Sequence, residues 1–473
     1  MEPPKSQIDF YVNLCEQLIS CDPLAANTSK HLRKDIETMK SRTLHEGLSF
    51  LTKSLPRLGK ALDQGLENSK FSIPAGFSQS SKNRSIPAFL QGYFNLVFDA
   101  EGILRGDAPG EGIAFLRQVC FLAYKLEAPY SVETEERVIS SFVDTDEELK
   151  LLDLSRIDLT LEAMITEDVF SDFDPKDIVP RHGPGAVATG ERLDDKWDFS
   201  RKYQDIHSFY PYYDYFVVGG ARELGDRLKW YRSLTPESSG CAKVVLVPKD
   251  SRGPRLISCE PLEYQWIQQG LGRKFMSHLE AHELTSGNIN FTRQEINKEL
   301  ALSSSRSRRY ATLDLKDASD RVSLELVRRI FGRCPRLLRA ILATRSTRTR
   351  LPDGSEITLN KFAPMGSALC FPVEAFVFWT VVVSALARAG IPSRRGAKLV
   401  YVYGDDIIVP TAYAELSMQA LESVGLLVNR QKSCIKGFFR ESCGTDAFKG
   451  VDITPTRLKK PWTGRRTDGS AFA

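Results

Sequence analysis

The sequence lacks the cysteine and histidine arrangements that hold disulfides or zinc. Nine cysteines and six histidines are scattered over 473 residues, no two cysteines form a Cys-x-x-Cys pair, and the histidines show no ligand spacing. An odd, dispersed set of cysteines argues against a disulfide framework, and the missing ligand spacing argues against a zinc site. The sequence therefore predicts a protein of a reducing cytosol.

Long apolar runs are also missing. The N-terminus begins Met-Glu-Pro-Pro-Lys and contains no apolar signal core. The longest apolar stretch, residues 375–386, is interrupted by Thr380 and Ser384 and bounded by Glu374 and Arg388. Because such a stretch is too short to span a bilayer, we predict a buried helix and no membrane association.

An excess of positive charge is absent overall, since the formal net charge is only +4. Hydrophobic residues make up 42% and charged residues 26%, which is typical of a globular chain with two or three domains or one large fold. The cations are clustered instead, and clusters on a near-neutral protein suit a polyanion path along one face. For any one cluster taken alone, a solvated loop is the favoured interpretation. The clusters are Arg306, Arg308 and Arg309; Arg345, Arg348 and Arg350; and Arg388, Arg394, Arg395 and Lys398.

Helical periodicity dominates the first 154 residues, and strand patterns alternate with helices later, which predicts an α+β fold. The aromatic-rich stretch 203–216 suits either a stacking platform for bases or a core, and we favour the core. His182 lies in a Gly/Pro turn, where a histidine is more often structural than a catalytic base.

The stretch from Leu399 to Pro410 predicts a hairpin that carries two adjacent carboxylates. Apolar runs rich in Val, Ile and Tyr flank a Gly-Asp-Asp tip, and Gly404 supplies a permissive backbone. Asp405 and Asp406 then lie side by side and repel each other unless a cation neutralises them. A hard divalent metal ion held by oxygen ligands would do so, although an ordinary acidic turn fits this stretch alone.

A second acidic strand end supports the metal interpretation. Residues 310–315 predict a strand that places Asp314 at its end, and Asp317 and Asp320 follow before a helix predicted over 322–330. An acidic strand end beside an acidic hairpin tip suits two-metal phosphoryl transfer, with Mg²⁺ as the fitting ion and Mn²⁺ as an alternative.

The residues after Asp314 also indicate whether the nucleotide sugar is ribose or deoxyribose. No aromatic residue lies between Asp314 and Ile330, whereas a polymerase that rejects ribonucleotides usually needs a bulky side chain there. Asp320 could instead accept a hydrogen bond from the 2′-hydroxyl, the group that marks RNA.

Two further segments supply candidate binding groups. Residues 241–261 predict a β-loop whose cations suit a triphosphate: Lys243, Lys249, Arg252 and Arg255. Gly366 and Ser367 form a small-residue turn before a long helix, where backbone can approach a sugar or template base. Lys432, after a short strand, could protonate pyrophosphate as a general acid, although a surface lysine is the ordinary alternative.

The order of these segments resembles motifs F, A, B, C and D of viral RNA-dependent RNA polymerases. The chain is most similar to the replicase catalytic subunit of single-stranded RNA bacteriophages, the levivirus type. The resemblance covers residues 181–460 and rests on His182 to Ala186, Val247 to Lys249 with Arg252 and Arg255, Glu260 and Pro261, Asp314 to Asp320, Met365 and Gly366, Tyr403 to Ile408, Phe439 to Gly444 and Gly450 to Asp452.

The resemblance implies a right-hand polymerase with fingers, an antiparallel palm sheet and a thumb, acting in the cytoplasm of an infected bacterial host. It places two Mg²⁺ ions on Asp314, Asp405, Asp406 and the backbone carbonyl of Leu315, and it assigns Asp320 to the ribose. Gly366 and Ser367 would place template and nucleotide. The implied partners are RNA template and product, ribonucleoside triphosphates, host elongation factors Tu and Ts, and a host ribosomal protein.

The implied domains are a helical N-terminal region with part of the fingers (1–180), fingers with the cationic β-loop (181–305), palm (306–436), and the start of a thumb (437–473). Family members continue well past the equivalent of Gly450, so the thumb is expected to be truncated or reduced. Two alternatives remain at this point, namely a reverse transcriptase and an inactive RNA-binding relic.

Overall fold

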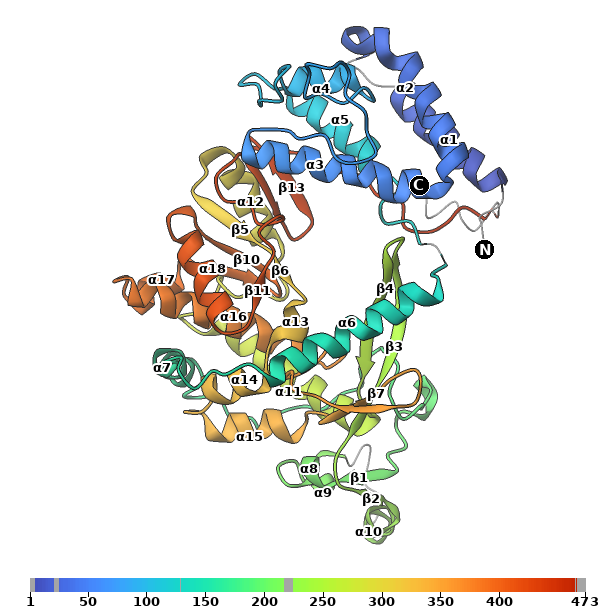
Figure 1. Ribbon diagram of the computed structural model, residues 1–473. Helices are drawn as coiled ribbons and strands as arrows, with labels where there is room; N and C mark the ends of the chain where they lie inside the picture. Colours follow the sequence, from blue (N-terminus) through green and yellow to red (C-terminus); the bar gives the residue numbers. More distant parts are fainter. Residues whose placement is uncertain (1–4, 21–24, 128, 217–223, 464, 466–473) are drawn as a thin grey trace.

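The computed structural model describes residues 5–20, 25–127, 129–216, 224–463 and 465, and Figure 1 shows its mixed helical and sheet architecture. The helices up to residue 281 are α1 (Lys5–Ser20), α2 (Ala25–Glu46), α3 (Leu55–Asn68), α4 (Gln91–Val97), α5 (Gly110–Phe121), α6 (Val132–Lys150), α7 (Thr160–Val169), α8 (Gln204–His207), α9 (Tyr212–Tyr215), α10 (Leu224–Ser233) and α11 (Leu262–Ala281). The later helices are α12 (Glu295–Ser307), α13 (Ala318–Arg321), α14 (Leu324–Ile330), α15 (Pro335–Ala343), α16 (Cys370–Arg388), α17 (Ser393–Ala397) and α18 (Ala414–Ser423).

The strands form small sheets that are mostly antiparallel. Those of the first half are β1 (Arg201–Tyr203), β2 (Thr235–Glu237), β3 (Cys241–Asp250) and β4 (Gly253–Cys259). The remainder are β5 (Tyr310–Leu313), β6 (Leu315–Lys316), β7 (Arg348–Arg350), β8 (Glu356–Thr358), β9 (Tyr401–Tyr403), β10 (Asp406–Pro410), β11 (Leu427–Val428), β12 (Phe439–Ser442), β13 (Thr445–Phe448) and β14 (Val451–Asp452). The sheets have the orders β1-β2, β5-β10-β9, β11-β6, β12-β13-β14 and β4-β3-β7-β8.

The antiparallel sheet β5-β10-β9 confirms both the predicted hairpin and the predicted strand before Asp314. Ile407 of β10 lies opposite Leu313 of β5 on one side and Val402 of β9 on the other. All four residues of β5 are buried, as are the three central residues of β10. Burial of apolar side chains therefore fixes the register, because a slip by one residue would turn them toward water. The helix predicted over 322–330 corresponds to α14, and the short helix α13 precedes it.

The apolar helix α16 passes through the main core against this sheet. Among the described residues it is the one helix with the length and composition of a membrane span, and 89% of that window is buried inside the protein. Its surroundings are those of a core helix, which confirms the predicted burial. The helix is longer than the apolar stretch 375–386, because Cys370 to Glu374 are also helical.

Two large apolar cores organise the chain. One gathers buried side chains between Leu154 and Val428, and it includes α16 and the central sheet. The other combines the helices of residues 11–126 with Phe439, Phe448 and Ile453 from the C-terminal part. Within these cores, β12 and β13 pack with the N-terminal helices, and α7 packs with α16. The domain boundaries at residues 180 and 437 stay a prediction.

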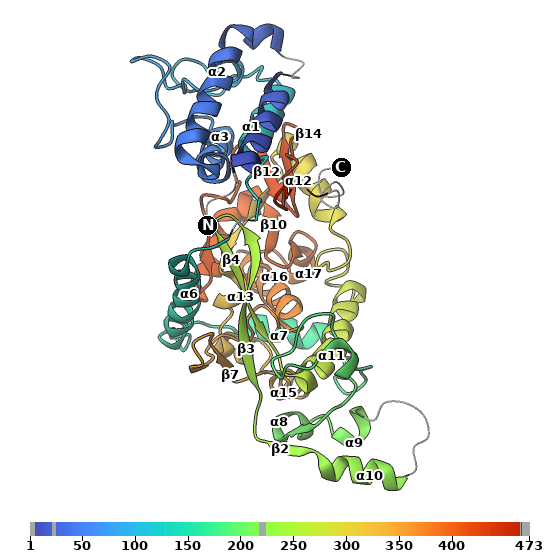
Figure 2. The same cartoon turned by 90° about the vertical axis from the view of Figure 1, so that its right-hand side faces the viewer.

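The β3–β4 ribbon lies opposite the central sheet, and helix α3 lies beyond the tip of the ribbon in Figure 1. At this tip, Ser251 Oγ donates to the carbonyl of Thr52 at 3.3 Å, and the Arg252 guanidinium lies over the Tyr124 ring. The N-terminal region is thus joined both to the sheet side, through β12 and β13, and to the ribbon. Figure 2 shows the ribbon running toward β2 and α8–α10, at the far end of the molecule from α1–α3.

The aromatic stretch 203–216 serves mainly as core, as predicted. Tyr203, Phe209, Tyr210, Tyr212 and Phe216 are all buried. Hydroxyl groups that enter this core find partners, since Tyr210 Oη donates to the carbonyl of Pro175 at 2.9 Å. Such bonds satisfy buried polar atoms and leave these rings unavailable for stacking on bases.

The junction of the N-terminal helices with β13 depends on a buried arginine, and its loss is expected to destabilise the fold. Arg117 is 1% exposed and pairs with Asp63 and, at 2.6 Å, with Asp446. We expect Arg117→Met to lower the free energy of unfolding by about 3–5 kcal/mol, because two carboxylates lose their buried partner. Chemical denaturation measures this change. The exposed pair of Arg33 with Glu37 provides the control, since Arg33→Met should cost less than about 1 kcal/mol. Equal effects of the two substitutions would contradict the assignment.

Candidate active site

The Gly-Asp-Asp tip packs against the first turn of α16. Gly404 adopts φ +63°, and a Cβ atom there would come within 2.1 Å of the Phe371 ring. Only glycine therefore fits this turn without displacing the ring. Asp405 stands exposed at the tip, and Asp406 begins β10 in a half-buried position.

The sheet register brings Asp314 to the same place from a distant part of the sequence. Leu313 pairs with Ile407 across β5 and β10. Asp314 follows Leu313 and Asp406 precedes Ile407, so both lie at the same end of this strand pair. The charge of Asp314 acts on both Asp405 and Asp406, so the three carboxylates are neighbours. The structure thus brings together the three carboxylates that the sequence predicted as a cluster.

The segment after β11 fixes the orientation of Asp314. Asn429 Nδ2 donates to Asp314 Oδ2 at 2.8 Å, and Lys432 Nζ donates to Oδ1 at 3.3 Å. The amide of Asp314 donates to Ser433 Oγ at 3.2 Å. Although burial opposes it, the Asp314 carboxylate raises the pKa of Lys432. Lys432 is therefore charged at neutral pH and lies within the cluster.

Electrostatic repulsion is concentrated at this site. Withdrawal from water, the charge of Asp405 and the charge of Asp314 together raise the pKa of Asp406 to about 6. Crowding by protein atoms and the charge of Asp314 also raise the pKa of Asp405. A carboxylate cluster with raised pKa values binds protons or cations more readily than isolated aspartates do.

The residues present fit divalent ions shared with a substrate rather than a closed protein cage. Among the described residues, no group of three or more His, Cys, Asp or Glu side chains is arranged so as to hold a metal ion alone. Mg²⁺ commonly uses one or two carboxylates together with substrate phosphates, so an incomplete protein ligand set is what such a site needs. Asp314, Asp405 and Asp406 supply the carboxylates. Leu315, predicted to add its carbonyl, lies in β6 opposite Val428.

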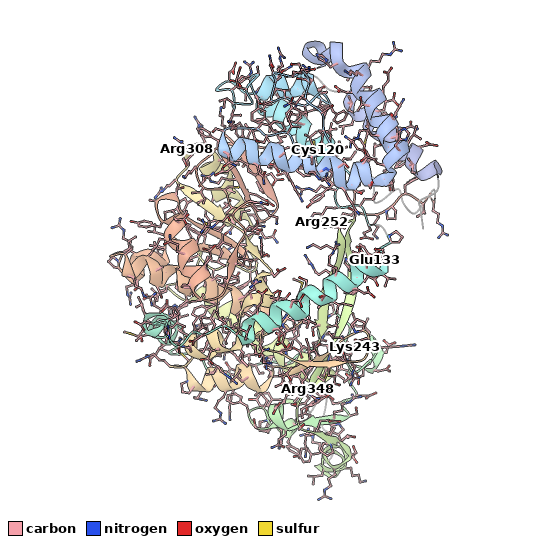
Figure 3. All side chains as sticks on the ribbon, in the orientation of Figure 1. Cys120, Glu133, Lys243, Arg252, Arg308 and Arg348 are labelled. Atoms are coloured by element: carbon pink, nitrogen blue, oxygen red, sulfur yellow. The ribbon has the colours of Figure 1, made fainter. Side chains whose placement is uncertain are left out.

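Three of the four predicted cations of the β3–β4 ribbon lie near its tip. One of them, Arg255, interacts electrostatically with the acidic cluster. The nearby charge of Arg255 opposes the rise in the pKa of Asp405 that burial and Asp314 cause. Burial and the charges of Arg255 and Arg252 lower the pKa of Lys249, so these three groups lie close together. Arg252 donates to both oxygens of Asp250, at 2.9 and 2.6 Å, and Figure 3 shows it on the side of the ribbon that faces the central sheet.

Lys243 is not part of this group. It lies near the start of β3, where it pairs with Arg350 of β7, and Figure 3 shows it well away from Arg252. There it lines a separate cavity of about 360 Å³ together with Arg201, Arg348 and Glu356. The sequence could not separate Lys243 from the other cations, because a ten-residue strand carries its two ends far apart in space.

The arginine clusters that suggested one polyanion path are used in several places. Arg345 is buried and donates to the carbonyls of Leu359, Lys361 and Phe362. Arg388 binds Glu162, and Arg394 binds Glu283. These residues are engaged by protein groups, and a single polyanion path through all the clusters stays a prediction.

The small-residue turn is occupied by protein contacts. Gly366 adopts φ +125°, and a Cβ atom there would meet the carbonyl oxygen of Ser258 at 2.2 Å. Ser367 is buried, and its hydroxyl donates to Gln268 Oε1 at 3.1 Å. In this structure Gly366 approaches β4 rather than a solvent-facing surface, so its predicted contact with template or nucleotide stays a prediction.

Asp320 lies in α13, on the path from Asp314 to α16. Its Oδ1 accepts a hydrogen bond from Lys361 Nζ at 3.0 Å. Its charge and that of Asp405 both raise the pKa of buried Glu374, after the larger effect of burial, so the three carboxyl groups are neighbours. The ribose-sensing role predicted for Asp320 stays a prediction, on a residue placed beside the acidic tip.

The sequence did not reveal several residues that border the site. Withdrawal from water and the charges of Asp446, Asp406 and Asp314 raise the pKa of Glu441 to about 7. Burial and the charges of Arg252 and Lys432 lower the pKa of Lys60, which places a cation of α3 near the ribbon. Glu441 lies in the recognisable segment 439–444, which was a usable signal. Lys60 lies on an ordinary amphipathic helix and gives none.

His182 is packed among aromatic side chains. Its ring lies 4.5 Å from those of Trp197 and Trp266, and both ring nitrogens lack a hydrogen-bond partner among the described residues. Burial lowers the pKa of His182 to about 4. A neutral imidazole packed among aromatic rings agrees with the structural role that the sequence favoured.

An antiparallel sheet with carboxylates on neighbouring strands, faced by cations, is the kind of site that nucleotidyl transfer requires. The profile of the family described as RNA replicase, beta-chain, matches residues 209–465. This match covers more than half of the chain, and the protein belongs to that family.

Relatives in this family come from bacteriophages. The RNA-directed RNA polymerase subunit beta of Enterobacteria phage SP is 36% identical over 219 residues, which are 46% of this chain and 36% of the relative. The RNA-directed RNA polymerase beta chain of Escherichia phage MS2 is 33% identical over 218 residues, which are 46% of this chain and 38% of the relative. That of Enterobacteria phage GA is 26% identical over 376 residues, 74% of this chain and 67% of the relative.

The matched region thus spans little more than a third of the SP and MS2 proteins. Among solved structures, the RNA-dependent RNA polymerase of bacteriophage phi12 overlaps 84% of this chain and 66% of its own, with 12% identity and a TM-score of 0.40. At this TM-score the likeness supports no further conclusion.

The raised pKa values predict how stability depends on pH and on Mg²⁺. The folded protein binds protons at Asp406 more tightly than the unfolded chain, whose value is near 3.8, so the extra stability is present below about pH 4 and is lost as the pH rises through about 6. Without divalent ions, the unfolding temperature should fall more steeply over this range than it does in Asp406→Asn. Thermal denaturation in buffered EDTA measures both.

Adding Mg²⁺ should raise the unfolding temperature more at about pH 7.5 than at about pH 5, because protons compete with the metal ion for the carboxylates. The same increase in Asp405→Asn, or an increase independent of pH, would contradict the site.

Proposed function

We propose that this chain is an RNA-directed RNA polymerase that replicates a viral single-stranded RNA genome from ribonucleoside triphosphates. One observation carries the proposal. The pairing of β5 with β10 brings Asp314 to the end of the sheet where Asp405 and Asp406 lie, and the charge of Arg255 from the ribbon acts on Asp405. Membership of the replicase family agrees with this chemistry.

In this proposal, Asp314, Asp405, Asp406 and the carbonyl of Leu315 would hold two Mg²⁺ ions, with Mn²⁺ as a substitute. Bound there, the ions would activate the primer 3′-hydroxyl and stabilise the leaving oxygens. The other steps belong to the chain itself. Lys249, Arg252 and Arg255 bind and orient the triphosphate through charge-assisted hydrogen bonds.

Two further side chains act on the nucleotide. Lys432 Nζ holds a proton beside Asp314, within reach of the departing pyrophosphate. Asp320 accepts a hydrogen bond from the ribose 2′-hydroxyl, which favours RNA precursors over deoxynucleotides.

The corresponding architecture is a right hand. We assign the sheets β5-β10-β9 and β11-β6, with α14, α16 and α18, to the palm. The β3–β4 ribbon belongs to the fingers, and the helices of residues 5–126 cover the site from the side of β12 and β13. Template and product would pass between the ribbon and the palm.

The cellular setting is a further part of the proposal. Bacteriophage relatives point to the cytoplasm of an infected bacterium, where host elongation factors Tu and Ts and a ribosomal protein would be available as subunits. Nucleotide incorporation by the purified chain, with and without bacterial extract, tests this directly. Activity that appears only with extract would support a requirement for host subunits.

Neither alternative has an observation in its favour. A reverse transcriptase would incorporate deoxyribonucleotides on an RNA template, and an inactive relic would bind RNA in a salt-sensitive manner without synthesis. Ribonucleotide-only incorporation separates the proposed polymerase from both.

The metal assignment predicts the behaviour of a single isosteric variant. Asp405→Asn removes one charge from the cluster and is expected to lower the rate of nucleotide incorporation by at least about 10³-fold, because Mg²⁺ binding and transition-state stabilisation depend on it. RNA affinity, measured by filter binding at fixed salt, should stay within about threefold of the unaltered protein. Near-normal turnover by Asp405→Asn would exclude the assignment.

The ribbon offers a matched pair of charge removals. Arg255→Gln is expected to raise the KM for ribonucleoside triphosphates by about tenfold, because one charge-assisted contact with phosphate is lost. Lys243→Gln removes the same charge from the other end of β3 and should leave KM within about twofold. Steady-state incorporation on a homopolymer template measures both values. A larger effect of Lys243→Gln than of Arg255→Gln would show that the triphosphate binds elsewhere.

A further inference from the structure

A buried lysine stands behind Asp320. The side chain of Lys361 has no solvent exposure, and its Nζ donates to Asp320 Oδ1 at 3.0 Å. The same Nζ donates to the carbonyl of Phe142 at 3.3 Å and lies 3.5 Å from the centre of the Phe142 ring. Asp146 of α6 is the second carboxylate near it, at 3.9 Å. Burial of an ammonium group is costly unless such partners surround it.

The backbone of Lys361 is fixed independently of Asp320. Its amide donates to Asp146 Oδ1 at 3.0 Å, and its carbonyl accepts a bond from Arg345 at 2.8 Å. The next residue, Phe362, donates to the carbonyl of Val322 at 2.7 Å, directly after α13. Lys361 therefore projects from a rigid segment tied to α6, whose end lies beside α13 in Figure 1.

Asp320 has little local support of its own. It belongs to α13, a four-residue helix that follows Asp317 in a left-handed conformation with φ +49°. So short a helix has almost no intrinsic stability, and its residues depend on tertiary contacts for their position. In the part of the chain that the structure describes, Lys361 is the hydrogen-bond partner of Oδ1, and no protein group bonds to Oδ2. The side chain of Asp320 is 27% exposed.

This geometry leaves one carboxylate oxygen of Asp320 open to a ligand while the other is anchored. A charged anchor behind a carboxylate keeps that carboxylate ionised and oriented, and an ionised acceptor binds a hydroxyl more strongly than a neutral one. Burial raises the pKa of Asp320, and the charge of Lys361 opposes that shift. The ordinary alternative is that Lys361 merely fastens α6 to α13.

We propose that Lys361 is a positioning residue for sugar selection, which holds Asp320 so that its free oxygen accepts the 2′-hydroxyl of the incoming ribonucleotide. This inference rests on the proposed polymerase function and adds a residue to it. Lys361 does not touch the nucleotide. It acts through Asp320, and its removal should change the choice between ribose and deoxyribose rather than the rate of bond formation alone.

The test compares incorporation of ATP and 2′-deoxy-ATP on one RNA template by the full chain. For Lys361→Met, the ratio of kcat/KM for ATP to that for 2′-deoxy-ATP is expected to fall by roughly tenfold, the effect of losing one charge-assisted hydrogen bond. Asp320→Ala should lower the ratio by a similar factor, and the double variant should lower it no further, because both act on one contact. Lys274→Met is the control and should leave the ratio unchanged. It removes a lysine of α11 that pairs with Asp177.

A merely structural role gives a different result. If Lys361→Met slows both nucleotides equally and leaves the ratio unchanged, or if only Asp320→Ala changes the ratio, the proposal is wrong. If Lys361→Met does not fold, Lys361→Gln and Lys361→Arg carry the test. The arginine variant, which keeps the charge, should retain more of the ribose preference than the glutamine variant, and the reverse order would overturn the proposal.

Failure of the polymerase function itself is distinguishable. Should the unaltered chain incorporate nothing, equilibrium binding of ATP and of 2′-deoxy-ATP in the presence of Mg²⁺ reports the same preference. Tighter binding of ATP that is lost in Lys361→Met would support the positioning role while the polymerase proposal fails. Equal binding of both nucleotides by the unaltered chain would overturn the positioning role as well.

Discussion

Mutual repulsion of carboxylates is the constraint on which the site depends. Asp314, Asp405 and Asp406 are forced together by a sheet whose buried side chains permit one register. Burial and the neighbouring carboxylates raise the pKa of Asp405 and of Asp406. Apolar burial along β5 and β10 stabilises the folded state enough to hold charges that would otherwise separate. A fold that holds this repulsion favours neutralisation of the cluster by protons or cations.

The surroundings of the cluster come from parts of the chain that are far apart in sequence. Lys432 and Asn429 approach Asp314 from beyond β11, and Arg255 approaches from the ribbon. The helices of the first 126 residues share a core with β12 and β13 and also contact the ribbon tip. The N-terminal region therefore connects opposite sides of the site. The packing of this region influences where the ribbon cations lie relative to the sheet.

Buried ionic groups form a second layer behind the groups that face the site. Arg117, Arg345 and Lys361 are almost fully buried, and each is saturated by carboxylates or carbonyls from several elements. Such networks cost desolvation energy and are satisfied in one arrangement, so they define how elements meet more than they add to net stability. In this protein they join α5 to β13, the segment 359–362 to the loop that follows α15, and α6 to α13.

The sequence by itself determined the local elements and the identity of the acidic residues. Apolar runs on both sides of Gly404 predict the hairpin, and the pattern of residues 310–315 predicts the strand before Asp314. The order of the motifs identified the family that the profile match confirmed. Local periodicity is read from neighbours along the chain, which is why these inferences needed no structure. The buried helix and the aromatic core were predictable for the same reason.

Only the tertiary structure decided which cations and carboxylates share a space. It separated Lys243 from Arg255 along one strand, turned the hydroxyl of Ser367 toward Gln268, and placed Glu441, Lys60 and Lys361 near the site. It also joined residues 439–458 to the N-terminal helices in one core. Long-range packing and register fix these relations, and a residue's neighbours in sequence carry no record of them.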